Sequence, residues 1–127
     1  MPWNPAQYGP TVAALLARAG DGLRPMPLVS PRTKDAGLAE ELCRPAGELF
    51  PGAAHPEAAL AGLWTYFGSF DEAHSIAQDI PTAEGSYWHG ILHRMEPDAW
   101  NAGYWFRRTG PHAVFAALGP AAAAAGY

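Results

Sequence analysis

The chain has 127 residues, of which 49% are hydrophobic, and its formal net charge is −4 with only 8 Lys and Arg. This length suits one domain with a real core. The shortage of basic residues excludes a general nucleic-acid binder and a polybasic membrane anchor. No apolar run approaches the ~20 residues of a membrane span, no signal peptide is recognisable, and a single cysteine excludes an internal disulfide. We therefore expect a cytoplasmic protein that binds neither nucleic acid nor membrane, with Cys43 as a small core residue.

Proline and glycine divide the first part of the chain into short segments. Thr11 at the front and Gly20 at the back delimit a first helix. Three prolines and the absence of an apolar period predict a loop over residues 21–33. Residues 35–43 predict a short helix that ends before Pro45.

The clearest helical signals lie between residues 56 and 108. Pro56 suits a first helical position, and Ser69-Phe-Asp-Glu72 is a capping-box pattern that starts a new helix directly after Gly68. Asp98 is a candidate cap after Pro97. Helices are predicted over 56–67, 70–78, 83–95 and 99–108. Because the connections within the two pairs are short, we expect two antiparallel hairpins.

Gly110-Pro111 ends the last of these helices and opens a final one over about 112–118. The alanine-rich tail is of low complexity, so residues 120–127 are predicted to fray. No segment shows clean strand alternation. The prediction is one all-α domain over residues 1–127, a small bundle of short helical hairpins. The two hairpins resemble tetratricopeptide-like repeats, with a spacing of 29 residues between corresponding motifs.

Residues 84–112 hold three of the five histidines and six of the fifteen aromatic residues. His89 and His93 are four residues apart and Glu96 follows three later, so all three fall on one face of a helix. Two imidazoles and a carboxylate are good ligands for a divalent transition metal such as zinc. Asp71, Glu72 or His74 on the preceding helix would supply a further ligand.

The same residues allow two other interpretations. The histidines can form a purely structural network with Glu96, Asp98 or backbone carbonyls, since buried polar groups need partners. They can also line a metal-free ligand pocket, to which Trp100, Tyr104 and Arg107 would contribute an aromatic wall and a cation. Two mid-helix glycines, Gly90 and Gly103, are each predicted to lie where two helices cross closely.

The segment from 71 to 115 also resembles a family of uncharacterised bacterial and fungal proteins. The matching residues are Asp71-Glu-Ala-His74, Ile76-Ala-Gln78, Gly85-Ser-Tyr-Trp-His-Gly-Ile-Leu-His-Arg94, Glu96, Asp98 and Asn101-Ala-Gly-Tyr-Trp-Phe-Arg-Arg108. Met95 stands where the family pattern has arginine. The resemblance implies no activity, but it implies that His74, His89, His93 and Glu96 belong to one feature.

Three functions follow from these observations. The first is a small helical binding domain with a pocket for a small ligand, formed by His74, His89, His93, Glu96, Trp100, Tyr104 and Arg107. The second is a metal-dependent hydrolase or related enzyme that uses His89, His93 and an acidic ligand. The third is a scaffold that binds another protein through an exposed aromatic patch. The sequence identifies neither a catalytic residue nor the ligand or partner.

Overall fold

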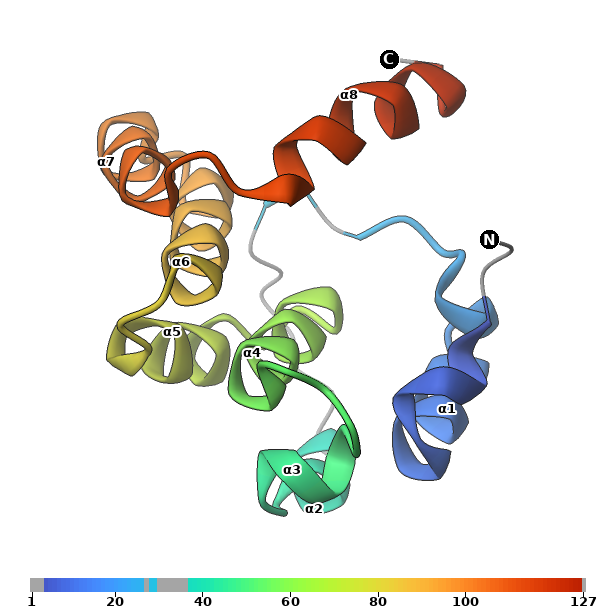
Figure 1. The fold of residues 1–127 in the computed structure, drawn as a ribbon. Coiled ribbons are helices and arrows are strands. Elements are labelled where there is room, and N and C mark those ends of the chain that lie inside the picture. Colours follow the sequence, from blue (N-terminus) through green and yellow to red (C-terminus); the bar gives the residue numbers. More distant parts are fainter. Residues whose placement is uncertain (1–3, 27, 30–36, 127) are drawn as a thin grey trace.

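The computed structural model describes residues 4–26, 28–29 and 37–126. Within these residues the chain forms eight α-helices and no strand, which confirms the all-α prediction (Figure 1). The helices are α1 Pro10–Ala17, α2 Leu38–Leu42, α3 Ala46–Leu49, α4 Pro56–Tyr66, α5 Phe70–Asp79, α6 Ala83–Met95, α7 Ala99–Thr109 and α8 Ala113–Ala124. Two short 3-10 helices, Pro5–Tyr8 and Gly20–Gly22, flank α1 in the sequence.

Several helices begin where side chains or proline favour a start. Pro56 takes the first position of α4, where a missing backbone N–H leaves no hydrogen bond unmade. At the start of α7, Oδ1 of Asp98 accepts the backbone N–H of Asn101 at 3.1 Å. At the start of α8, Nδ1 of His112 accepts the backbone N–H of Val114 at 3.0 Å. Each bond satisfies a donor that the helix itself cannot pair.

Neighbouring helices pack in pairs, α4 with α5 and α6 with α7, and α5 also packs against α6 (Figure 1). The α4–α5 connection is short because Gly68 adopts φ +80°, and the N–H of Ser69 donates to the carbonyl of Trp64 at 2.9 Å. Ser69 makes no capping bond through its side chain. Both predicted pairs are present, and each helix ends within one residue of its predicted limit.

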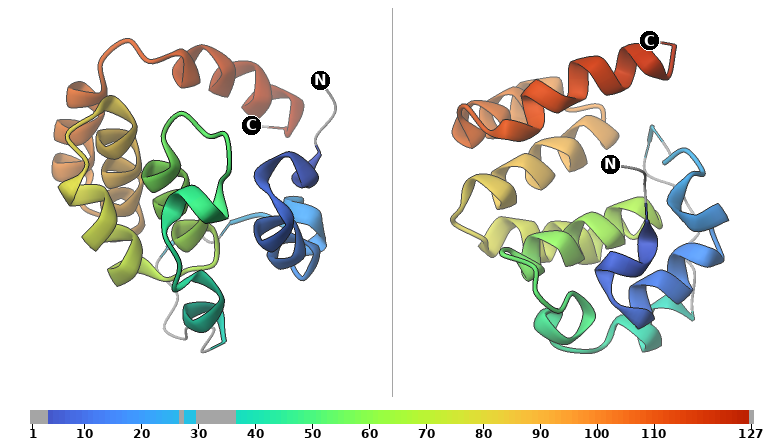
Figure 2. Two further views of the ribbon diagram at one scale, coloured as in Figure 1. Left: turned by 60° about the horizontal axis from the view of Figure 1, so that its bottom comes forward. Right: turned by 45° about the vertical axis from the view of Figure 1, so that its right-hand side comes forward.

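The hydrophobic core lies around α4 and draws side chains from every α-helix except α7 and α8. Its most buried large members include Val12, Leu38, Leu49 and Leu92. In contrast, α8 buries no residue and lies apart from α1–α5 at the top of both views in Figure 2. The body of the protein therefore packs around α4, and α8 is an appendage to it.

Close helix contacts explain some of the mid-helix glycines. A Cβ on Gly90 of α6 would lie 2.7 Å from the ring of Phe106 on α7, so the predicted close crossing is confirmed there. A Cβ on Gly103 would meet only Arg107 of its own helix, at 3.2 Å, so that part of the prediction is wrong. A crossing that the sequence reasoning missed lies at Gly62 of α4, where a Cβ would collide with the ring of Trp88 on α6.

Other expectations need correction. The last helix continues past Leu118 to Ala124, with Pro120 inside it, because alanine is a strong helix former. Cys43 is exposed because it follows the short helix α2 instead of lying on its buried face. Parts of the predicted segments 21–33, 35–43 and 120–127 lie outside the described residues. No helix in the described part of the chain is long and apolar enough to cross a membrane.

Candidate metal centre

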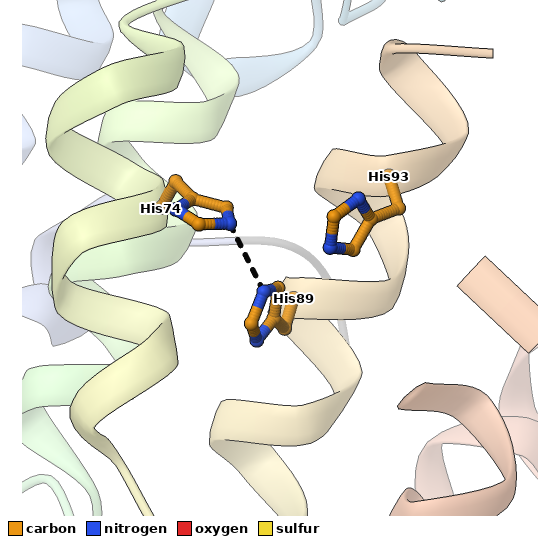
Figure 3. A group of neighbouring side chains, drawn as sticks. All are labelled: His74, His89 and His93. Carbon is orange, nitrogen blue, oxygen red and sulfur yellow. Dashed lines mark hydrogen bonds between the residues drawn. The ribbon is translucent and has the colours of Figure 1, made fainter. Parts of the chain in front are cut away.

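Three histidine side chains converge between α5 and α6, as Figure 3 shows. His74 comes from α5, and His89 and His93 come from α6. Each offers one ring nitrogen, and the three nitrogens lie within 4.8 Å of one another. Nε2 of His74 and Nε2 of His89 are 3.0 Å apart. The structure thus brings together all three histidines that the sequence singled out.

Helical geometry accounts for this convergence. His89 and His93 are one turn apart, so their rings stack on one face of α6 with centroids 4.9 Å apart and planes 19° apart. Because α5 packs against α6, the ring of His74 meets both of them edge-on, at centroid distances of 4.6 and 5.6 Å. The site therefore depends on the α5–α6 contact as much as on the spacing within α6.

Aromatic rings enclose two of the three imidazoles. Trp105 of α7 stacks on His89 with centroids 3.9 Å apart, and Phe70 of α5 stacks on His74 at 5.7 Å. These contacts hold the rings in fixed planes and keep water from one side of each. His89 is only 5% exposed as a result. The sequence analysis gave neither Trp105 nor Phe70 a role in the site, so it missed both of these aromatic contacts.

Glu96 orients the third histidine from outside the cluster. Its Oε2 lies 2.9 Å from Nδ1 of His93, so Nδ1–H of the neutral ring donates to the carboxylate. This tautomer leaves the lone pair on Nε2, the nitrogen directed toward the other two rings in Figure 3. A carboxylate that holds a histidine in this way is the usual partner of a metal-binding imidazole.

His89 is the most strongly perturbed group of the site. Burial, aided by the neighbouring His74 and His93, lowers its pKa from 6.5 to about 4. It is therefore neutral at pH 7, which is the form that binds a metal. Its Nδ1 is buried and has no hydrogen-bond partner among the described residues. Because a metal on Nε2 would place the proton on this Nδ1, the missing partner is a cost that metal binding must overcome.

The spacing of the nitrogens suits a small tetrahedral metal ion. Zn–N bonds of about 2.0–2.1 Å place two nitrogens of a tetrahedral site about 3.3 Å apart. The His74–His89 separation of 3.0 Å is close to this value, and a ring nitrogen of His93 lies within 4.8 Å of both. Neutral imidazoles suit zinc, copper, nickel and iron, whereas Mg²⁺ and Ca²⁺ prefer oxygen ligands. The arrangement could therefore hold a divalent transition metal.

The expected ligand set of His89, His93 and Glu96 is not the one that the structure assembles. Glu96 lies just past the end of α6 and reaches the Nδ1 edge of His93, away from His89. It belongs to a second candidate group, with His93 and Asp98. His74 takes its place in the histidine group. Of the other acidic candidates, Asp71 and Glu72 line a surface depression beside Trp64 and are not part of either group.

The remaining predicted ligand-binding residues lie on α7, mostly at the surface. Trp100 is 76% exposed and Tyr104 is 39% exposed. Arg107 is also exposed. The arginine that contacts this aromatic group is Arg108, whose guanidinium carbon lies 5.8 Å from the Tyr104 ring and 5.3 Å from the Trp105 ring. Trp105 therefore links the histidine group to this exposed face of α7.

A separate polar group joins the starts of three helices. Oε1 of Glu84, in the first turn of α6, lies 3.0 Å from Nε2 of His112 and 3.5 Å from Nε2 of His55. Nδ1 of His112 already accepts a backbone N–H, so the neutral ring carries its proton on Nε2 and donates to Glu84. Hydrogen bonds from the Glu84 backbone, His112 and Thr82 lower the pKa of this carboxyl, although burial opposes them.

Comparisons with protein-family models, curated proteins and solved structures found no match to this chain. The resemblance drawn from the motifs between residues 71 and 115 therefore stays a prediction. The site must be interpreted from its own geometry.

Proposed function

We propose that this protein is a small helical binding domain whose ligand is a divalent transition metal ion, held by His74, His89 and His93. The observation that carries the proposal is the convergence of three imidazole nitrogens within 4.8 Å. Glu96 would act from outside, by fixing the tautomer and orientation of His93. Trp105 and Phe70 would hold the other two rings in place.

The competing interpretation is a structural histidine network. A hydrogen bond between His74 and His89 explains the 3.0 Å separation equally well. It does not explain why a ring nitrogen of His93 also lies within 4.8 Å of the pair. This difference favours a ligand that the three rings share.

The test is a metal titration of the untagged protein after treatment with a chelator. Zn²⁺ in competition with a chromophoric chelator should bind with one equivalent per chain. His74→Ala and His93→Ala should each weaken binding at least tenfold, and Glu96→Gln by about 10–100-fold through loss of ring orientation. His55→Ala, which removes a histidine outside the group, is the matched control and should bind normally. Absence of stoichiometric binding, or equal binding by all four variants, would refute the proposal.

A second candidate function is metal-dependent hydrolysis. Three histidines leave a fourth position for water in catalytic zinc sites, where the metal lowers the pKa of that water toward 7. The observation in favour is that the side chain of His93 retains 12% exposure and that of Glu96 retains 41%, so the centre is accessible from this side. Hydrolysis of p-nitrophenyl acetate should require Zn²⁺ and disappear in His93→Ala. Zn²⁺ binding without metal-dependent turnover would leave only the binding function.

We also propose that the α4–α5 and α6–α7 pairs are antiparallel hairpins of the tetratricopeptide-like kind. The packing of each pair and the short connection at Gly68 support this relation. Such repeats bury their apolar faces only by stacking on their neighbours. The contact between α5 and α6, which assembles the histidines, would then be the interface between two repeats.

A further inference from the structure

An apolar cavity of about 290 Å³ lies between the N-terminal helix and α4, away from the histidine group. One wall comes from α1 and the short helices that flank it, and the other comes from α4. The side chain of Trp88 on α6 also lines the cavity. The described residues that line it include Tyr8, Ala59, Gly62, Tyr66 and Trp88. Among the described residues, the polar groups on the lining side chains are the hydroxyls of Tyr8 and Tyr66 and the indole N–H of Trp88.

The shape of the cavity follows from two features of the fold. α1 packs on α3 and on its two flanking 3-10 helices, which leaves a gap toward α4. Gly62 leaves no side chain on α4 where Trp88 approaches, so the indole ring lies directly against the helix backbone. A Cβ at that position would displace the ring. Glycine therefore allows Trp88 to form part of the cavity.

The cavity is open to the surface and is not an enclosed void. A volume of about 290 Å³ corresponds to roughly ten water-sized groups at about 30 Å³ each. Apolar concave sites of about this size and larger are where proteins bind small molecules. The mostly apolar lining would bury the hydrocarbon part of a ligand and would make few hydrogen bonds to it.

A positive charge lies beside one wall. The guanidinium of Arg24 is 5.8 Å from the centre of the Tyr66 ring, and Oη of Tyr66 donates to the Arg24 carbonyl at 2.7 Å. These two contacts tie Arg24 to a lining residue. Among the described residues, Arg24 makes no ion pair with a carboxylate. Its charge is therefore available to an anion at the edge of the cavity.

We propose that the cavity binds a small amphipathic carboxylate, with the hydrocarbon chain between α1 and α4 and the carboxylate at Arg24. The apolar walls select the body of the ligand, and the guanidinium selects its head group. On the order of ten non-hydrogen atoms fit the volume, which is the size of a medium-chain fatty acid. This site is independent of the metal centre, because none of its lining residues belongs to the histidine group.

The test compares two probes of equal chain length. Octanoate and 1-octanol are titrated into the full chain by calorimetry in the presence of EDTA, so that the metal centre does not contribute. Both should bind, and octanoate should bind at least threefold more tightly. If neither binds at millimolar concentration, the cavity is not a ligand site. If octanol binds as tightly as octanoate, the role of Arg24 is refuted.

Variants locate the binding. Ala59→Phe projects a ring into the cavity and should abolish binding of both probes while the far-UV circular dichroism stays unchanged. Ala59→Leu is a smaller filler that should weaken binding if the larger residue prevents folding. Arg24→Gln should remove the preference for octanoate and leave octanol binding unchanged. Arg94→Gln, an exposed arginine farther along α6, is the charge-matched control. Equal loss of preference in both arginine variants would overturn the assignment.

Discussion

His89 shows how one residue combines several constraints. It is almost completely buried, stacked on Trp105 and within hydrogen-bond distance of His74. A neutral imidazole at this position leaves its buried Nδ1 without a hydrogen-bond partner among the described residues. Burying a charged imidazole here would cost far more free energy. The protonation of His89 should therefore be visible in the stability of the metal-free protein.

We expect the metal-free protein to lose stability through His89 as the pH falls from about 6.5 to about 4. The folded-state pKa of about 4 lies below the unfolded value of about 6.5. Above pH 6.5 the residue is neutral in both states and has no effect. Between these values only the unfolded state gains the proton, so the free energy of unfolding falls by about 1.4 kcal/mol per pH unit, roughly 3 kcal/mol in all.

Urea denaturation at pH 7.5 and pH 4.5 in EDTA measures this effect. Because other groups also titrate, the comparison is with His89→Gln. The loss of stability between the two pH values should be smaller in this variant by about 2–3 kcal/mol. An identical loss in both proteins would contradict the lowered pKa.

At the scale of elements, the packing of α6 against α7 determines how closely Trp105 covers the His89 ring. α7 presents Trp105 to His89 only because the two helices approach closely, and the close approach occurs where Gly90 meets Phe106. Gly90 lies next to His89 in the sequence. A change in the distance between the helices at this point would move the Trp105 wall as well as the core contact.

Gly90→Ala should therefore destabilise the fold, although alanine favours a helix. The added methyl would lie 2.7 Å from the Phe106 ring, and such overpacking typically costs about 1–3 kcal/mol. Gly103→Ala is the matched control on α7. Its methyl would meet only the end of the flexible Arg107 side chain, so it should gain up to about 1 kcal/mol from helix propensity. Thermal denaturation decides, and a raised melting temperature for Gly90→Ala would contradict the tight crossing.

At the scale of the whole molecule, the sequence predicted what local patterns control. Proline or glycine stands close to both ends of each of the four helices between residues 56 and 109, and a spacing of four places His89 and His93 on one face. It could not predict contacts that depend on how helices rotate against each other. His74 joins the histidine group only through the α5–α6 contact, and the Gly62–Trp88 contact and the cavity between α1 and α4 arise only from packing. Glu96 lies outside that group because it is the residue that ends α6.

The attachment of α8 also depends on tertiary contacts. The helix buries no residue, and its ring contacts with the body come from Phe115, which lies 5.9 Å from the Tyr87 ring and 6.3 Å from the Phe106 ring. His112 ties its start to Glu84. Two such edge-to-face pairs contribute about 0.5–1.5 kcal/mol each beyond the area they bury. The fold of α1–α7 should therefore persist without α8.

A chain truncated after His112 should fold and bind Zn²⁺ like the full chain. The free energy of unfolding should fall by about 1–3 kcal/mol, because the two Phe115 contacts are lost while the His112–Glu84 bond can remain. The single variant Phe115→Ala should reproduce most of this loss, which separates the role of one side chain from that of the whole helix. Urea denaturation and Zn²⁺ titration measure the two properties. A truncated chain that is unfolded would show instead that α8 is required for the core around α4.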